Sequence, residues 1–157
     1  MRNQEAEFIR GARRGNRNPE VFLGVDKCKA RLASAQSIPD VTATALAFTV
    51  EDFDYNTLHS NTTNTSRIVV KNAGVYAIYG YAVFAASAVG IRQWRIRING
   101  TDAEISTINA AATGSHHNGV FGVFNLSAFY YVELVVYQSS GGALDVNPGN
   151  LAVIRLP

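Results

Sequence analysis

The sequence is poor in the features that would mark a disulfide-bonded, membrane-spanning or secreted protein. It has one cysteine, Cys28, among 157 residues, so no disulfide can form within the chain. Only 17% of the residues are charged and 47% are apolar, which is typical of a packed domain and argues against disorder. No apolar run is long enough to span a bilayer, and residues 1–20 lack the apolar segment of a secretory signal. We therefore expect one domain, made in a reducing cytoplasm, with no membrane partner.

Motifs of enzyme chemistry are also missing. The sequence has no nucleophile elbow of the form Gly-x-Ser-x-Gly, no phosphate loop and no dinucleotide fingerprint. His59 and the pair His116-His117 have no metal-ligand spacing beside them, so we interpret all three as solvated loop residues. We likewise interpret Asp52 and Asp54 as a solvated acidic loop rather than part of a calcium site. The sequence predicts no enzyme, no metal site and no cofactor.

Charge is distributed unevenly along the chain. Residues 1–20 carry a net charge of +2, whereas residues 21–157 balance nine basic against nine acidic side chains. This division predicts a docking arm over residues 1–20 and a β domain over residues 21–157. Arginine pairs with the carboxylates of protein surfaces, and the glutamates of the arm argue against a nucleic-acid partner. The arginines that we expect to dock are Arg2, Arg10, Arg13, Arg14 and Arg17.

The clearest strand pattern ends in a hairpin turn. Residues 92–98 alternate between apolar and polar side chains, which predicts Trp94, Ile96 and Ile98 inside and Arg95 and Arg97 outside. The following Asn99-Gly100 pair predicts a type I′ turn, because both positions of that turn need a positive φ.

Other segments with strand patterns fill the rest of the chain. We expect strands over residues 21–32, 41–51, 66–71, 74–85, 102–108, 119–127, 131–138 and 151–156. Alternation within the first of them places the side chain of Cys28 inward. Eight or nine strands without a helix in the body predict a β-sandwich or jelly roll.

The run 74–85 differs from the other strands because both of its alternating faces are apolar. Its twelve residues include no charged side chain. In a β-sandwich only one face of a strand meets the second sheet, so the other face needs a different cover. We expect a neighbouring copy of the chain to supply it, because exposed apolar area on this scale marks an interface.

Residues 40–157 resemble the jelly roll of complement globular heads and tumour necrosis factors. The resemblance depends on ordered segments: Phe48 with Asp52-Phe53-Asp54, Arg67-Ile68-Val69-Val70, Gly74-Val75-Tyr76, Arg97-Ile98-Asn99-Gly100, Val123-Phe124-Asn125-Leu126, Tyr131 to Val136 and Leu151 to Leu156. Phe129-Tyr130 stands where that family usually has a Gly-Asp turn, so this turn needs another geometry. No collagen-like Gly-x-y repeat is present, and the arm stands in its place.

This resemblance implies an all-β, jelly-roll β-sandwich that forms a homotrimer, with an extended N-terminal arm. In such a trimer, Ala77, Tyr79 and Tyr81 of the central strand would face the three-fold axis. Phe121 and Val123, on the strand expected to pair beside it, would face the axis too.

Together these features predict a structural protein of a virion. We expect a trimeric capsid decoration (cement) protein or short head fibre of a bacteriophage-like particle. Its arm would anchor it to the major capsid protein or to another virion structural protein. Two alternatives stay open: a receptor-binding knob of a phage tail fibre, and a bacterial complement-like surface ligand.

Overall fold

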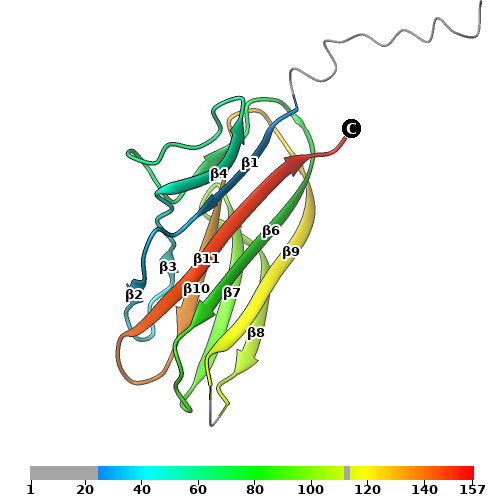
Figure 1. Ribbon diagram of the computed structural model, residues 1–157. Helices are drawn as coiled ribbons and strands as arrows, with labels where there is room; N and C mark the ends of the chain where they lie inside the picture. Colours follow the sequence, from blue (N-terminus) through cyan, green and yellow to red (C-terminus); the bar gives the residue numbers. More distant parts are fainter. Residues whose placement is uncertain (1–24, 112–113) are drawn as a thin grey trace, which may run out of the picture.

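Two antiparallel β-sheets stacked face to face make up residues 25–111 and 114–157, the part of the chain that the computed structural model describes (Figure 1). Eleven strands and no helix occur in these residues. In chain order they are β1 (Lys27–Arg31), β2 (Gln36–Ile38), β3 (Thr44–Ala45), β4 (Val50–Tyr55), β5 (Ile68–Val69), β6 (Gly74–Phe84), β7 (Ile91–Ile98), β8 (Thr101–Asn109), β9 (His116–Leu126), β10 (Tyr131–Gln138) and β11 (Leu144–Arg155). The all-β prediction is confirmed. The strands outnumber the eight or nine expected because β2, β3 and β5 are only two or three residues long.

The two sheets are called the β6 sheet and the β10 sheet. The β6 sheet has the order β4-β1-β11-β6-β9, and β2 also pairs with β11. The β10 sheet has the order β3-β10-β7-β8, and β5 also pairs with β10. Strands far apart in the sequence lie side by side in both sheets, as Figure 1 shows for β1 and β11. The first and last described strands are therefore joined in one ladder.

The core lies between the sheets and joins them at specific points. Trp94 of β7 is fully buried, and its indole Nε1 donates a hydrogen bond of 2.9 Å to the carbonyl oxygen of Ala82 on β6. The ring of Phe84 packs edge-on against it, with 5.4 Å between the ring centroids. Opposite Leu134, β6 carries Gly80, where an added Cβ would lie only 2.6 Å from the Leu134 Cδ1. A larger residue at position 80 would therefore require the Leu134 side chain to move.

The hairpin between β7 and β8 has the predicted geometry. Asn99 and Gly100 have φ angles of 48° and 83°, as a type I′ turn requires. Trp94 and Ile96 are fully buried on β7, in agreement with the alternation. In the turn before β10, Phe129 takes a φ of 68°, in the left-handed region that glycine adopts most easily, and the expectation of a turn geometry other than that of Gly-Asp stays a prediction.

Residues 41–51 do not form the single strand that their alternation predicts. The chain pairs with β10 as β3 and then joins the β6 sheet as β4, which continues to Tyr55. Leu46 and Phe48 are fully buried, as expected, but they lie in the crossing between the sheets. The alternation of apolar residues correctly predicted that Leu46 and Phe48 are buried. It did not predict the strand pairing, because an extended segment that crosses between the sheets also points every second side chain into the core.

The last strand is longer than predicted. β11 begins at Leu144, seven residues before the expected start at Leu151. Its pairing with β6 shifts register between Val146 and Gly149, and this bulge contains Pro148. A bulge leaves a residue without a ladder bond, which accommodates a proline that would otherwise end the strand.

The arm of residues 1–20, with its docking residues Arg2, Arg10, Arg13, Arg14 and Arg17, lies outside the described residues. Within residues 25–111 and 114–157, no helix is long and apolar enough to cross a membrane.

Candidate interaction surface

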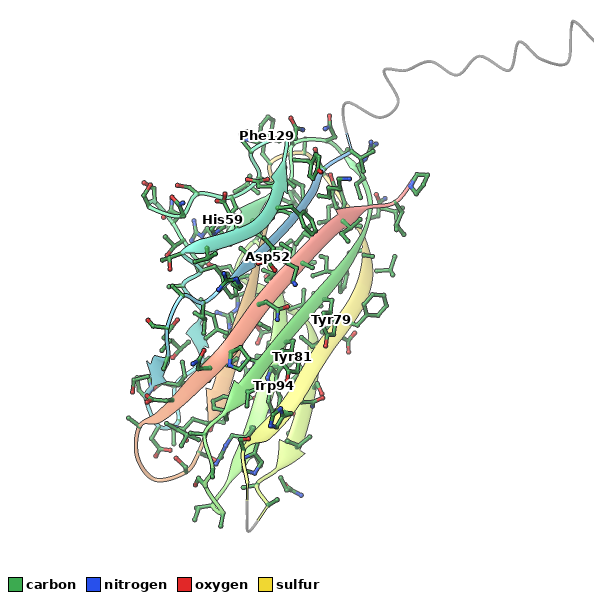
Figure 2. The ribbon with its side chains drawn as sticks, in the orientation of Figure 1. Asp52, His59, Tyr79, Tyr81, Trp94 and Phe129 are labelled. Carbon is green, nitrogen blue, oxygen red and sulfur yellow. The ribbon has the colours of Figure 1, made fainter. Side chains whose placement is uncertain are left out.

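The five residues expected at a trimer axis lie on one face of the molecule, the outer face of the β6 sheet. β9 pairs directly with β6, as predicted, and sets Phe121 opposite Tyr79 and Val123 opposite Ala77. Tyr81 lies two residues beyond Tyr79 on the same strand, so it shares this face. Figure 2 shows Tyr79 and Tyr81 following one another along β6. The structure brings all five together, and their role in assembly stays a prediction.

Neighbouring strands extend this set into a continuous surface. Ala152 and Ile154 of β11 lie opposite Tyr79 and Ala77 on the other side of β6, and Val75 continues the row toward the start of β6. We call this surface the apolar face; it comprises Val75, Ala77, Tyr79, Tyr81, Phe121, Val123, Ala152 and Ile154. Val75, Ala152 and Ile154 were not among the residues predicted to lie on it. The alternation in residues 151–155 was the signal that could have located the two on β11.

The apolar face is open to solvent in the single chain. Phe121 is 59% exposed, Val123 52% and Tyr79 43%, and Val75 and Ile154 are also exposed. Single exposed apolar residues are ordinary, but a contiguous group on three adjacent strands is typical of a binding surface. No charged side chain belongs to this group, so burying it against an apolar partner would require no desolvated ion.

Packing within the sheet holds the centre of the apolar face in place. Gly119 of β9 lies beside Tyr79, and a Cβ added there would be 2.9 Å from the Tyr79 Cε2 and Oη. The tyrosine ring therefore lies over the glycine backbone, where a side chain would displace it. A surface that is ordered before binding loses less conformational entropy when a partner covers it.

One end of the apolar face is polar and contains a histidine. The Tyr81 Oη lies 3.2 Å from the His117 Nδ1, and the His117 Nε2 lies 2.8 Å from the Ser115 Oγ. The prediction that His116 and His117 lie in a loop is wrong, because β9 begins at His116, whereas His117 is exposed to solvent as expected. His116 is also only 4% exposed, and its Nε2 accepts a hydrogen bond of 2.8 Å from the Ala111 N–H.

The third histidine is not a solvated loop residue either. The His59 side chain is fully buried, with its Nδ1 2.9 Å from the Glu51 Oε1 and its Nε2 3.1 Å from the Thr65 carbonyl oxygen. The long loop after β4 folds back onto that strand, which covers the imidazole. The composition of the loop could not indicate this contact, because Glu51 lies eight residues earlier in the chain.

The acidic residues of the predicted loop belong to the edge strand β4. Asp52 forms ion pairs of 2.8 Å with Lys29 and 2.9 Å with Arg31, both on the adjacent β1. The hydrogen bond from Lys29, with further help from Arg31, holds the pKa of Asp52 below its usual value. Asp54 accepts hydrogen bonds from the backbone N–H groups of Leu58 and His59. Both carboxylates therefore have structural partners and lie on a strand, so the interpretation as a loop is wrong, whereas Asp52 is exposed to solvent as expected.

Neither Cys28 nor the metal-binding residue types form a reactive site in the part of the chain that the structure describes. The Cys28 side chain is fully buried on the inner face of β1, as predicted, and burial raises the pKa of its thiol. A thiol held in its neutral form is a poor nucleophile, which indicates a structural residue. In the part of the chain that the structure describes, no group of three or more His, Cys, Asp or Glu residues is arranged to hold a metal ion.

Comparison with known proteins finds similarity in fold and none in sequence. No model of a known protein family matches the chain, and no curated protein matches it in sequence. Among solved structures, the globular domain of zebrafish complement 1qA has a TM-score of 0.63 at 12% identity, over 84% of this chain and 98% of that one. Murine APRIL has a TM-score of 0.60 at 12% identity, over 84% and 99% of the two chains. Eiger TNF from S. frugiperda has a TM-score of 0.55 at 11% identity, over 85% and 94%.

These likenesses define the class of the domain. The chain has the jelly-roll β-sandwich fold of complement 1q heads and tumour necrosis factors, and the resemblance detected in the sequence is confirmed at the level of the fold.

Proposed function

We propose that this protein is a homotrimer that serves as a structural component of a virion, as a capsid decoration protein or short head fibre of a bacteriophage-like particle. The observation that supports the proposal of a trimer is the apolar face, an ordered and uncharged surface over β6, β9 and β11. Three copies that meet on this face would remove it from water around one axis. The fold supports a three-fold arrangement by analogy, because the family that it resembles assembles in this way.

The proposed role in a virion is based on the difference between the body, which has the strands and the apolar face, and the arm, which has the net positive charge. The body has the strands and the apolar face but none of the sequence motifs of catalysis, which favours a structural role over an enzyme. The net positive charge resides in residues 1–20, where five arginines could pair with carboxylates of a shell protein. A trimer anchored by three such arms would bind its particle with avidity, since each arm raises the effective concentration of the next.

Deleting residues 2–18 tests the arm. We expect the shortened chain to remain folded and trimeric, and to lose its attachment to the particle, because the arm carries the docking charges. Replacing the five arginines of the arm by glutamine should have the same effect, and attachment of the complete protein should weaken as salt rises. Wild-type occupancy of particles by the shortened chain would show that the body docks by itself.

Removing the protein from the particle tests which of two roles it has, that of a capsid decoration protein or that of a receptor-binding knob of a tail fibre. A decoration protein binds only the assembled shell and so stabilises it by mass action. Particles without it should still infect, but they should release their genome at a lower temperature. Loss of adsorption to cells with unchanged heat resistance would favour the receptor-binding knob instead.

A further inference from the structure

A residue whose charge can change near neutral pH lies at the polar end of the apolar face. His117 of β9 points to the same side of its strand as Phe121 and Val123, because side chains two positions apart share a face. It lies opposite Val83 of β6 and is exposed to solvent in the single chain. Histidine is the side chain that ordinarily changes charge between about pH 5 and pH 8. A partner that covers the apolar face as far as Tyr81 would therefore also cover a residue whose charge depends on pH.

Two neutral hydroxyl groups hold the imidazole ring of His117. Its Nδ1 lies 3.2 Å from the Tyr81 Oη, and its Nε2 lies 2.8 Å from the Ser115 Oγ. A hydroxyl oxygen can donate or accept a hydrogen bond, so the neutral ring and the doubly protonated ring can each keep both contacts. Protonation therefore changes the charge of this group and breaks no hydrogen bond within the chain.

No carboxylate balances that charge in the part of the chain that the structure describes. His117 forms no ion pair with any residue of the ranges 25–111 and 114–157. The neighbouring β6 has tyrosines but no charged residue, and residues 110–115 contain no titratable side chain. Charged residues on the other strands are Arg92, Arg95 and Arg97 of β7 and Asp102 and Glu104 of β8, in the second sheet, and Asp145 and Arg155 near the two ends of β11.

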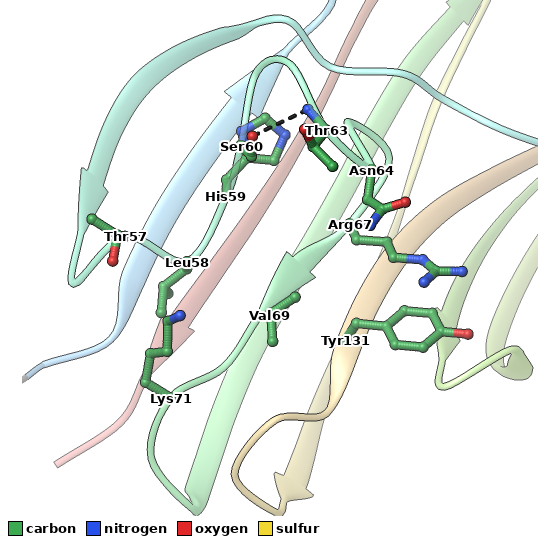
Figure 3. Close-up of a pocket in the computed structure, with 10 residues that line it drawn as sticks. All are labelled: Thr57, Leu58, His59, Ser60, Thr63, Asn64, Arg67, Val69, Lys71 and Tyr131. Carbon is green, nitrogen blue, oxygen red and sulfur yellow. Dashed lines mark hydrogen bonds between the residues drawn. The ribbon is translucent and has the colours of Figure 1, made fainter.

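The other two histidines keep their surroundings when the apolar face is covered. His59 lines a pocket where the loop of residues 56–67 folds over β5 and the start of β10, and no lining residue belongs to β6, β9 or β11 (Figure 3). Its ring is fully buried, with the Nδ1 2.9 Å from the Glu51 Oε1. His116 precedes His117 on β9, but it points into the sandwich and is already buried. Of the three histidines in the sequence, His117 is therefore the one whose exposure would change on assembly.

We infer that His117 makes assembly through the apolar face depend on pH: the trimer forms while the imidazole is neutral and dissociates as the ring takes up a second proton. This inference rests on the proposed trimer and concerns the regulation of its interface. A neutral His117 with both nitrogens hydrogen-bonded can be covered without leaving a polar group unpaired. A protonated His117 would have to lose water while it faces an apolar surface without a carboxylate, which disfavours the assembled state.

The direction of the effect follows from the number of protons that each state binds. The free chain leaves His117 in water, where it accepts the second proton, whereas the trimer excludes that proton from three copies of the ring. Acid therefore favours the free chain. The association constant of the trimer should fall by up to about a thousandfold for each pH unit, which corresponds to three protons. This fall should occur between about pH 8 and pH 5, where histidine titrates.

Light scattering of the full-length protein at about pH 7.5 and about pH 5.5, on either side of the histidine titration, tests the inference. The wild type should have the mass of a trimer at the higher pH and a smaller mass at the lower pH. His117→Gln is the matched control, because its amide donates and accepts hydrogen bonds but cannot take up a charge. This variant should be a trimer at both pH values. His117→Lys carries a positive charge at both and should form a trimer at neither.

The outcomes separate this inference from the trimer itself. Circular dichroism at both pH values shows whether each protein stays folded, as expected for changes at an exposed position. A wild type that remains trimeric at the lower pH, or a trimeric His117→Lys, would overturn the role of His117 and leave the proposed trimer in place. Dissociation of His117→Gln in acid to the same extent as the wild type would overturn that role too, because another group would then be responsible. Absence of a wild-type trimer at the higher pH would refute the proposed trimer, and this inference with it.

Discussion

The outer faces of the two sheets are opposite in character although both sheets are antiparallel and share one core. On the β10 sheet, Arg95 and Arg97 both pair with Asp102, at 2.8 and 2.7 Å, and Arg67 pairs with Glu133. These charged side chains of that face therefore pair with one another within the chain. On the β6 sheet, the ion pairs stay at β1 and β4, and the apolar face over β6, β9 and β11 has no charge.

The difference shows how a single sandwich can direct its assembly. A face with paired charges gains little from a partner, because each ion pair would have to be desolvated. A face of ordered apolar residues gains roughly 25 cal/mol for each Å² that a partner removes from water. One sheet is thereby suited to solvent and the other to contact with a copy of the chain. Of the four predictions below, the first and the last test this contrast and the other two test a buried carboxylate; they run from the largest expected effect to the smallest.

The strongest test places a charge on each outer face in turn. Tyr79→Asp should abolish the trimer, because assembly would bury three unpaired carboxylates near one axis. Ile105→Asp on the outer face of the β10 sheet is the matched control: Ile105 is 46% exposed and Tyr79 43%. This control should leave the trimer intact. Light scattering measures the mass of each variant, and an intact trimer of Tyr79→Asp would refute the contrast between the faces.

A smaller effect is expected from a buried carboxylate that ties the first described strand to the start of β6. Asp26 is fully buried and accepts hydrogen bonds from the Tyr76 Oη at 2.6 Å and the Asn56 Nδ2 at 2.7 Å, and from the backbone and side chain of Asn72. Asp26→Asn replaces one acceptor oxygen by an NH2 group, which cannot accept the hydrogen bonds that these groups donate. We therefore expect a loss of about 2–3 kcal/mol in the free energy of unfolding. Urea denaturation at pH 7 measures it.

The same carboxylate predicts a dependence on pH. Burial would raise the pKa of Asp26, but the hydrogen bonds from Tyr76, Asn56 and Asn72 outweigh it and hold the pKa below its ordinary value. The stability that Asp26 contributes is therefore complete above the unfolded-state pKa of about 3.9 and is lost as the pH falls through the lower folded-state value. Asp26→Asn should make unfolding less sensitive to acid below about pH 4 than it is in the wild type. Equal sensitivity in both proteins would contradict this assignment.

The smallest effect is expected on the outer face of the β10 sheet. Asp102→Asn removes the partner of Arg95 and Arg97, but all three side chains are partly exposed, so the cost should be below about 1 kcal/mol. Added salt should reduce the cost further, because it screens the pair in the wild type. Urea denaturation at low and high salt measures both effects. A loss as large as that of Asp26→Asn would show that these ion pairs do more than satisfy a solvent face.

Local patterns in the sequence were sufficient for most of the strands. The alternation around Trp94, the Asn99-Gly100 pair and the charge-free run of β6 each encode their structure within a few residues, because side-chain direction and turn geometry depend on nearby backbone angles. The position of Cys28 was predictable for the same reason. These local signals also indicated a β-sandwich, and the family resemblance then pointed to five residues of the apolar face.

Other features depended on contacts between distant residues, which no local pattern contains. The burial of His59 and His116 and the pairing of Asp52 arise where separate segments meet. The pocket similarly joins a loop before β5 to Tyr131 on β10, more than 60 residues later in the sequence. The sequence by itself determined which residues are apolar and how they alternate. Only the tertiary structure decided which apolar face stays uncovered, because that depends on which sheet receives the ion pairs and which strands become neighbours.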